Sequence, residues 1–420
     1  MVTLAYILSG VPLLMSTLLL LRLKMPQGFY LLALKIMAVA LSPVWAVMGL
    51  AGAVTGWIYQ ASWAIPMGLV GGGIMIAYIW RVTREHHGLE KAFGTAWSDS
   101  IPPEREKRMI RKRWNGYARM KASPEPSWER NLPFWTLPGS DRKLLCDVWS
   151  PAAGNRSGLA FLFFHGGAWY MMDKDLLTRP FFRHLVAQGH TVMDVAYRLC
   201  PEVDIFGMVG DVKRAISWMK ANASRYGVDP ERIVLAGGSA GGHLALLAAY
   251  TPALPALTPD DLQNDDLSVC GVVSYYGPTD MLAEYQHTNQ ERLRAKNLPR
   301  VSVGPGSTLT VTPGTWRMDA LLGGWPQDAL PNYQLASPST HVHPDCPPTL
   351  LIQGSLDFIT PVDATCSLHK SLVEAGVPAI NVVLPWTDHG FDMLLPQINP
   401  AAQSALYDVD RFLAIMLSRG

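Results

Sequence analysis

The feature that most restricts the fold of this chain is a serine set between glycines, where a strand-like run meets a helical run. The residues are Gly237-Gly238-Ser239-Ala240-Gly241, a G-x-S-x-G pattern. ERIVLAG before it is typical of a buried strand, and HLALLAAY after it is typical of a helix. The glycines relieve the crowding of a sharp turn that exposes the serine at the strand's carboxyl end. We therefore predict that Ser239 is a nucleophile, in preference to a chance occurrence of a common pattern.

A second glycine turn, His165-Gly166-Gly167-Ala168-Trp169, follows the apolar run LAFLFF. Attack of a serine on a carbonyl group creates an oxyanion, which needs N–H donors about 3 Å away. Gly166 and Gly167 can present backbone N–H groups without a side chain in the way, and Ala240, directly after the serine, would add a third. A plain glycine turn would explain the glycines but not their pairing with the serine turn. We expect His165 to support the loop rather than to carry protons, and the supporting or substrate-binding residues to be His165, Trp169 and Gly238.

Ser239 needs a base and a supporting acid, and these should follow it in the order acid, then histidine. Asp357 lies in the loop after the strand-like run PTLLIQG, and His389 lies in the loop after INVVLP. Catalytic groups collect at the carboxyl ends of strands in open sheets. Two other carboxylates compete for the acid role. We expect Asp363 to begin a helix, and Asp388 adjoins the histidine and cannot easily face its Nδ1, so Asp357 is preferred.

From about residue 129 onward, short apolar runs alternate with helical stretches such as 208–226 and 242–250. This alternation favours a mostly parallel sheet flanked by helices. The strand-like runs are KLLCDVWS, LAFLFF, HTVMDVAY, RIVLAG, CGVVSYYG, PTLLIQG and INVVLP.

Six motifs between about residues 155 and 415 resemble the hormone-sensitive-lipase-like branch of the α/β-hydrolases, which includes bacterial esterases and arylacetamide-deacetylase relatives. The motifs are HGGAW, YRLCPE, GGSAGGH, YGPTD, GSLDFITP and DHGF. The resemblance implies an α/β-hydrolase fold with a mostly parallel, eight-stranded sheet whose first hairpin is antiparallel. It also implies a cap, built from residues before the core and from an insertion at about 281–335. The Gly/Pro-rich part of that insertion, about 299–314, is expected to act as a lid over the acyl pocket.

The first eighty residues contain three long apolar runs, at 4–21, roughly 29–52 and roughly 62–80. Each is long enough to cross a hydrocarbon core of about 30 Å. Lys35 in the second run is expected to snorkel to the membrane interface. We therefore predict about three transmembrane helices. A cleaved signal peptide is the alternative for the first run, which lacks a basic start, and a soluble hydrophobic cap is the alternative for all three.

Basic residues predict the orientation of these helices. Arg22 and Lys24 lie after the first run and Arg81 and Arg84 after the third, whereas the loop at 53–61 has none. Three crossings place both basic segments on one side, which the positive-inside rule makes cytoplasmic. A cytoplasmic catalytic domain agrees with five scattered cysteines that form no metal or disulfide pattern.

We accordingly divide the chain into a transmembrane anchor (1–82), a basic linker or cap segment (83–128) and an α/β-hydrolase catalytic domain (129–420). The basic stretch 97–123 could attract anionic head groups or form a solvated linker helix, and the sequence leaves both open. A net charge of +1 gives no field for nucleic acid.

The expected function is that of a membrane-anchored serine carboxylesterase or lipase acting on apolar esters, with the bilayer as a partner and without a metal or organic cofactor. One alternative within enzymes is an acyltransferase or deacetylase that uses the same three residues. Two alternatives outside enzymes are a non-catalytic ligand-binding protein of the same fold and a membrane scaffold with a hydrolase-like docking domain.

Overall fold

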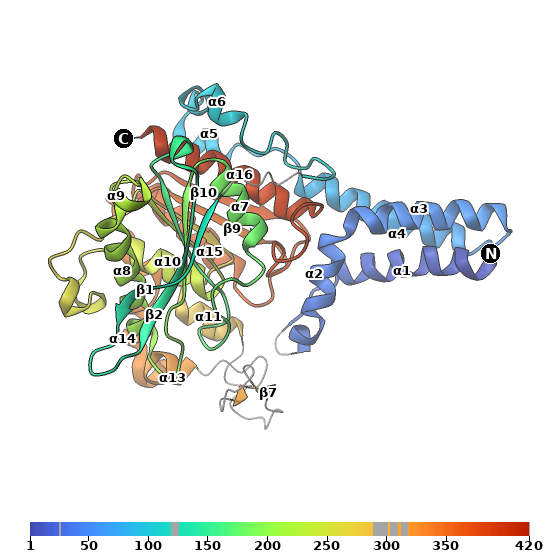
Figure 1. Ribbon diagram of the computed structural model, residues 1–420. Coiled ribbons are helices and arrows are strands. Elements are labelled where there is room, and N and C mark those ends of the chain that lie inside the picture. The colour runs from blue at the N-terminus through green and yellow to red at the C-terminus, as the bar shows by residue number, and fades with distance from the viewer. Residues whose placement is uncertain (25–26, 119–125, 289–300, 303–309, 312–317, 420) are drawn as a thin grey trace.

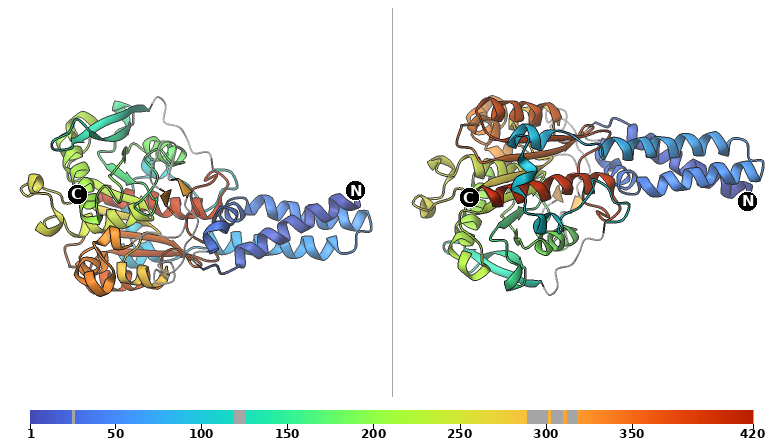
Figure 2. Two further views of the ribbon diagram at one scale, coloured as in Figure 1. Left: turned by 90° about the horizontal axis from the view of Figure 1, so that it is seen from below. Right: turned by 90° about the horizontal axis from the view of Figure 1, so that it is seen from above.

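The computed structural model describes residues 1–24, 27–118, 126–288, 301–302, 310–311 and 318–419. It contains a bundle of long helices and a larger part built around a sheet (Figure 1). Both further views show the bundle projecting from one side of the sheet-containing part, with the N-terminus at the far end of the bundle (Figure 2).

The larger part is organised around an eight-stranded sheet with the order β1-β2-β4-β3-β5-β6-β9-β10. The strand β2 is antiparallel to both β1 and β4, and all other neighbours are parallel. This confirms the expected sheet with its antiparallel first hairpin. The strands are β1 (Ser127–Thr136), β2 (Lys143–Ser150), β3 (Ala160–Phe164), β4 (Thr191–Val195), β5 (Ile233–Gly238), β6 (Gly271–Tyr275), β9 (Thr349–Gly354) and β10 (Ala379–Leu384). The short strands β7 (Val301–Ser302) and β8 (Thr310–Val311) pair separately.

Helices cover both faces of this sheet, because alternate strand residues point to opposite sides. Leu162 of β3 and Leu235 of β5 belong to the core shared with α8 and α10, whereas Phe161 and Val234 belong to the core shared with α7 and α16. The helices of the larger part are α7 (Arg179–Ala187), α8 (Ile205–Ala221), α9 (Ala223–Tyr226), α10 (Ala240–Tyr250), α11 (Met281–His287), α13 (Met318–Leu322), α14 (Pro326–Leu335), α15 (Val362–Glu374) and α16 (Pro400–Ser418).

The N-terminal bundle consists of α1 (Val2–Leu20), α3 (Ser42–Ile58) and α4 (Ala64–Val82). The helices α1 and α4 are long and apolar enough to cross a membrane, and a third span is possible if α3 is counted with the segment before it. That segment, η1 (Gln27–Leu31) and α2 (Leu32–Ala40), meets α3 at a bend of 74°.

The prediction of one continuous span over 29–52 is therefore wrong. Pro43 stands at the start of α3, where a proline begins a helix more readily than it continues one. The new helix then runs on to Ile58, into residues that were expected to form a loop.

Small residues bring the three bundle helices close together, and large apolar residues face outward. A Cβ atom on Gly49 would lie 2.8 Å from the carbonyl oxygen of Gly68, closer than real contacts allow. On the outside, Leu14, Val47 and Trp57 are 62%, 68% and 71% exposed. Close approach at small residues with an apolar exterior is the pattern of helices packed in a bilayer.

The segment after the bundle contains α5 (Gly88–Phe93), η2 (Trp97–Ser100) and α6 (Pro103–Glu106). The helix α5 packs against β10, and η2 packs against α16. Arg113 is buried and its guanidinium lies 2.6 Å from Asp408, which also contacts His86 at 3.0 Å. The backbone N–H of Ile110 donates to Asp410 at 2.8 Å. The side chain of Arg113 is therefore bound within this chain. It neither contacts lipid head groups nor lies on a solvated linker helix, the two alternatives that the sequence left open for 97–123.

The insertion at 281–335 contributes α11, α13 and α14 to the described structure. Apart from the short strands β7 and β8, the predicted lid at 299–314 lies outside the described residues.

Candidate active site

Ser239 occupies the turn between β5 and α10 with φ 54° and ψ −122°. A positive φ is unfavourable for a serine, and such strain persists only where the surroundings impose it. The N–H of Ser239 donates to the carbonyl of Tyr275 at the end of β6 (2.9 Å), and its own carbonyl accepts from the N–H of His243 in α10 (3.0 Å). The turn therefore holds the hydroxyl at the carboxyl end of the sheet, as the glycine pattern predicts.

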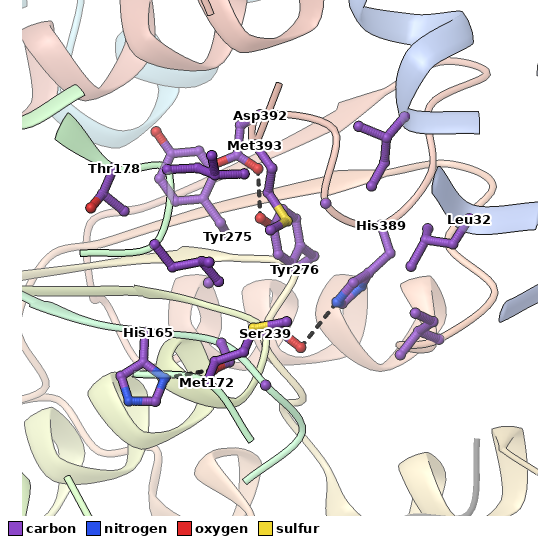
Figure 3. A pocket seen from close by; sticks show the side chains of 18 of the residues that line it. Leu32, His165, Met172, Thr178, Ser239, Tyr275, Tyr276, His389, Asp392 and Met393 are labelled. Atoms are coloured by element: carbon purple, nitrogen blue, oxygen red, sulfur yellow. Dashed lines mark hydrogen bonds between the residues drawn. The ribbon is translucent and has the colours of Figure 1, made fainter. Parts of the chain in front are cut away.

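His389 links Ser239 to Asp357. Its Nε2 lies 3.0 Å from the Oγ of Ser239, and its Nδ1 lies 2.9 Å from the Oδ2 of Asp357. A carboxylate only accepts, so Nδ1 carries the proton and Nε2 turns its lone pair toward the hydroxyl. Figure 3 shows the His389 ring directed at Ser239, with Leu32 on its other side.

The carboxylate of Asp357 is buried and its orientation is fixed by further donors. Its Oδ1 accepts the N–H groups of Ile359 and Thr360, both at 2.9 Å, and its Oδ2 also accepts from the side chain of Gln353 at 3.3 Å. The loop after β9 thus wraps around the carboxylate of Asp357 and presents one oxygen to His389.

The two competing carboxylates lie elsewhere. Asp363 is in the first turn of α15, as expected. Asp388 turns away from the imidazole, and its Oδ2 forms an ion pair with Lys35 of α2 at 2.6 Å. Lys35 is buried, 1% exposed, and its Nζ also donates to the carbonyl of Leu21. The expectation that Lys35 snorkels to the membrane interface is therefore wrong, because a buried carboxylate binds it instead.

The expected oxyanion donors lie next to Ser239. A Cβ atom on Gly166 would lie 3.1 Å from the carbonyl of Gly238 and 3.4 Å from the Cβ of Ser239, so this loop lies directly against the serine turn. Gly167 has φ 120°, and a Cβ there would overlap the carbonyl of Met171. Ala240 is the first residue of α10, so its N–H has no partner within the helix.

His165 supports this loop. Its ring stacks on Tyr197 with 4.4 Å between centroids, and its Nδ1 donates to the carbonyl of Gly166 at 2.7 Å. Burial lowers the pKa of His165, which favours the neutral ring. The histidine lines the cavity described below, and so does Gly238.

Trp169 does not line the cavity. It is buried, and its indole N–H donates to the Nδ1 of His243 at 3.2 Å. The Nε2 of His243 in turn donates to the carbonyl of Ala336 at 2.7 Å. Of the two roles considered for Trp169, the geometry fits support of the loop rather than contact with substrate.

Sequence reasoning missed a tyrosine beside His389. The rings of Tyr276 and His389 lie 4.4 Å apart, and the Tyr276 hydroxyl donates to Asp392 at 2.5 Å. Burial raises the pKa of Asp392. The sequence feature that could have indicated this tyrosine is its position directly after β6. That strand pairs with β5, which Ser239 follows.

Ser239 and His389 face a cavity of about 360 Å³. Its walls are mainly apolar. They come from the ends of β3, β5 and β6, from the loops after these strands and after β9 and β10, from α7 and α16, and from the segment η1–α2 of the N-terminal unit, residues 1–82. The residues from that last segment are Phe29, Leu32, Ala33 and Ile36. No wall residue comes from the described part of the 281–335 insertion. Part of the cavity wall is therefore formed by a helix that was predicted to be part of a membrane span.

An eight-stranded, mostly parallel sheet with a serine on the sharp turn after β5 is the architecture of the α/β-hydrolases. Within that class the chain belongs to the BD-FAE family, whose model matches residues 146–372.

Two of the curated relatives of this chain are proteins of Mycobacterium tuberculosis. "Probable carboxylic ester hydrolase LipM" is 32% identical over 64% of this chain and 57% of its own length. "Esterase LipQ" is 27% identical over 80% of this chain and 74% of its own length. The alignment with LipM thus spans little more than half of that relative.

Among solved structures, the propionate-bound esterase Est2 of Thermogutta terrifontis is similar with a TM-score of 0.52. It is 24% identical and covers 70% of this chain and 95% of its own. A truncated carbohydrate esterase from gut microbiota has a TM-score of 0.53 at 22% identity, covering 73% of this chain and 100% of its own. These similarities concern the fold.

Proposed function

We propose that this chain is a membrane-anchored serine carboxylesterase or lipase that hydrolyses apolar carboxylic esters. The observation that carries the proposal is the contact of one imidazole with both Ser239 (3.0 Å) and Asp357 (2.9 Å). The names of the curated relatives, a carboxylic ester hydrolase and an esterase, support the same reaction.

In the proposed reaction Ser239 attacks the carbonyl carbon of the ester while His389 takes the hydroxyl proton at Nε2. Asp357 holds the ring in the required tautomer and stabilises the imidazolium. The imidazolium then gives its proton to the departing alcohol, which leaves an acyl group on Ser239. A water molecule activated by the same imidazole releases the acid and restores the serine.

The negative charge on the carbonyl oxygen needs stabilisation during both steps. The N–H groups of Gly166, Gly167 and Ala240 are the proposed donors, each contributing about 3 to 4 kcal/mol by analogy with measured oxyanion holes. Their position on a fixed loop and at a helix N-terminus means that little reorganisation is needed when the charge forms.

The walls of the cavity support an apolar substrate. Beyond Ser239, aliphatic and aromatic side chains from α2 and from the loop after β3 surround the space, which suits an acyl chain better than a sugar. Met172 and Leu177 line the cavity and are nevertheless 43% and 58% exposed, so its rim is also apolar.

The membrane position is also part of the proposal. The helices α1, α3 and α4 would form the anchor, and each is about 25 to 29 Å long at 1.5 Å per residue. Arg22 and Lys24 follow α1, and Arg81 and Arg84 lie at or just after the end of α4. These ends of the two helices lie next to the sheet-containing part (Figure 1), which fits a cytoplasmic catalytic domain. All five cysteines are unpaired, as a reducing compartment would require.

The test is an activity screen with full-length wild-type protein and Ser239→Ala in parallel, in detergent micelles, with p-nitrophenyl esters from acetate to palmitate. We expect hydrolysis by wild type only, with kcat/KM rising with acyl length and with incorporation into micelles. A preference for soluble p-nitrophenyl acetate would contradict the apolar substrate class. Formation of a new ester from an added alcohol, faster than the free acid, would favour the acyltransferase alternative.

A further inference from the structure

The helix α2 packs against the two loops that carry Asp357 and His389. A Cβ atom on Gly28, just before α2, would lie 3.0 Å from the ring of Phe358, next to Asp357. At the other loop, a Cβ on Gly390, next to His389, would lie 3.3 Å from the Cδ1 of Ile36. Both loops therefore have the N-terminal unit as their immediate neighbour.

Asp388 joins the same two loops through a single carboxylate. Its Oδ1 accepts the backbone N–H of His389 at 3.0 Å and the backbone N–H of Phe358 at 3.3 Å. The carboxylate of Asp388 is therefore one of the contacts that hold the two loops together. The N–H of Leu356 also donates to the carbonyl of Thr387 at 2.9 Å.

The other oxygen of this carboxylate, Oδ2, lies 2.6 Å from the Nζ of Lys35. Both side chains are almost fully buried, with 1% of Lys35 and 3% of Asp388 exposed. In the described part of the chain, Lys35 is the one ion-pair partner of Asp388. Removing one partner of a buried pair leaves an uncompensated charge, here directly beside His389.

The position of Lys35 in the sequence is itself informative. Ionisable side chains within apolar helices are expensive and are kept where they bind a specific partner. Leu32 and Ile36, which neighbour Lys35 on α2, line the cavity in front of Ser239. The lysine therefore fixes the helix that also forms the cavity wall.

We propose that Lys35 is a positioning residue for the reaction. By holding Asp388 it aligns the loops of Asp357 and His389, so that the N-terminal unit is a required part of the active site and not only an anchor. This inference rests on the proposed function of Ser239, because it assigns a role within the same reaction.

The experiment compares full-length wild type, Lys35→Met, Asp388→Asn and the double variant Lys35→Met/Asp388→Asn in micelles, with p-nitrophenyl acetate as the ester. Lys213→Met is the matched control, because Lys213 is also buried but binds Thr251 and Thr258, which are outside the site. Each kcat is normalised to the folded fraction, measured by size-exclusion chromatography and tryptophan fluorescence.

We expect Lys35→Met to lower kcat by about 100-fold, the effect of a small misplacement of a catalytic group, with KM for this short ester changed less than about threefold. The kcat of the double variant should be at least about tenfold higher than that of Lys35→Met, since the double variant removes both charges together. The control should keep the kcat of wild type per folded molecule. If Lys35→Met does not fold, a loss of kcat in Asp388→Asn with unchanged KM supports the inference.

Wild-type kcat in folded Lys35→Met, or in folded Asp388→Asn, would overturn the inference and leave the esterase proposal intact. Absence of ester hydrolysis by wild type itself would overturn both. The two failures are therefore distinguishable in one set of measurements.

Discussion

The Nε2 of His389 lies within 3.0 Å of the Oγ of Ser239 although the two residues are 150 positions apart in the chain. Their approach follows from the sheet. β10 lies beyond β6 and β9 from β5, and the parallel arrangement of these strands brings the loops after β5, β9 and β10 to the same edge. The proposed chemistry depends on this convergence at the carboxyl ends of the strands.

The assignment of the acid predicts a clear difference between two aspartates. Asp357→Asn should lower kcat by about 10³- to 10⁴-fold, because an asparagine favours the wrong tautomer of His389. Asp363→Asn should leave kcat near that of wild type, since Asp363 lies in the first turn of α15. Steady-state hydrolysis of a short p-nitrophenyl ester measures both. Equal losses in the two variants would contradict the assignment.

The oxyanion loop predicts that Gly167 does not tolerate a methyl group. Gly167→Ala would force the loop away from Met171 and so displace the donor N–H groups, and we expect kcat to fall by about 10²- to 10³-fold. Gly376→Ala is a control for the loss of a glycine with positive φ, because a Cβ at Gly376 meets nothing within 4 Å. Gly376→Ala should lose some thermal stability but keep the kcat of wild type. A fully active Gly167→Ala would exclude this loop as the donor.

The wall formed by α2 predicts a change in acyl-length preference. Ile36→Trp should fill part of the cavity and lower kcat/KM for palmitate esters by about tenfold or more, while acetate esters change little. The control is Leu34→Trp, on the same helix, because Leu34 is 41% exposed and does not line the cavity. Unchanged kcat/KM for palmitate esters in Ile36→Trp would mean that the acyl chain does not lie along α2.

His243 predicts a loss of stability in acid. Burial lowers the pKa of His243 to about 4, so the unfolded chain binds one more proton than the folded chain between that pH and about 6.5. The contribution of neutral His243 to the free energy of unfolding is fully present above pH 6.5. It is lost as the pH falls toward 4, by up to roughly 3 kcal/mol. His243→Gln should therefore flatten the fall of the thermal midpoint over this range.

The control for that prediction is His87→Gln, because the side chain of His87 is 79% exposed. This variant should follow the acid profile of wild type. An unchanged profile in His243→Gln would show that another group, such as His190, whose pKa burial lowers to about 3, dominates the acid response.

Much of the sheet and of the site could be predicted from the sequence, since local patterns carry that information. The seven strand-like runs correspond to β2–β6, β9 and β10, because buried parallel strands read as short apolar runs. The loops that hold Ser239, Asp357 and His389 follow directly from those runs. In contrast, β1 was not visible as a strand, since it is an exposed edge with Pro133 inside it.

What could not be predicted are the contacts between distant segments. Hydropathy shows that residues 29–52 are apolar but not that α2 bends away from α3 to cover the cavity. A lysine in such a run has the same local signature whether it reaches the interface or a buried carboxylate. Only the tertiary structure pairs Lys35 with Asp388, because the two residues are 353 positions apart in the chain.

The most direct test of the central claim is to treat full-length protein with a fluorophosphonate, digest it and locate the adduct by mass spectrometry. We predict one adduct, on Ser239, which appears as ester hydrolysis is lost and is absent from Ser239→Ala and much slower in His389→Ala. An adduct on another residue, or ester hydrolysis that persists in Ser239→Ala, would contradict the account.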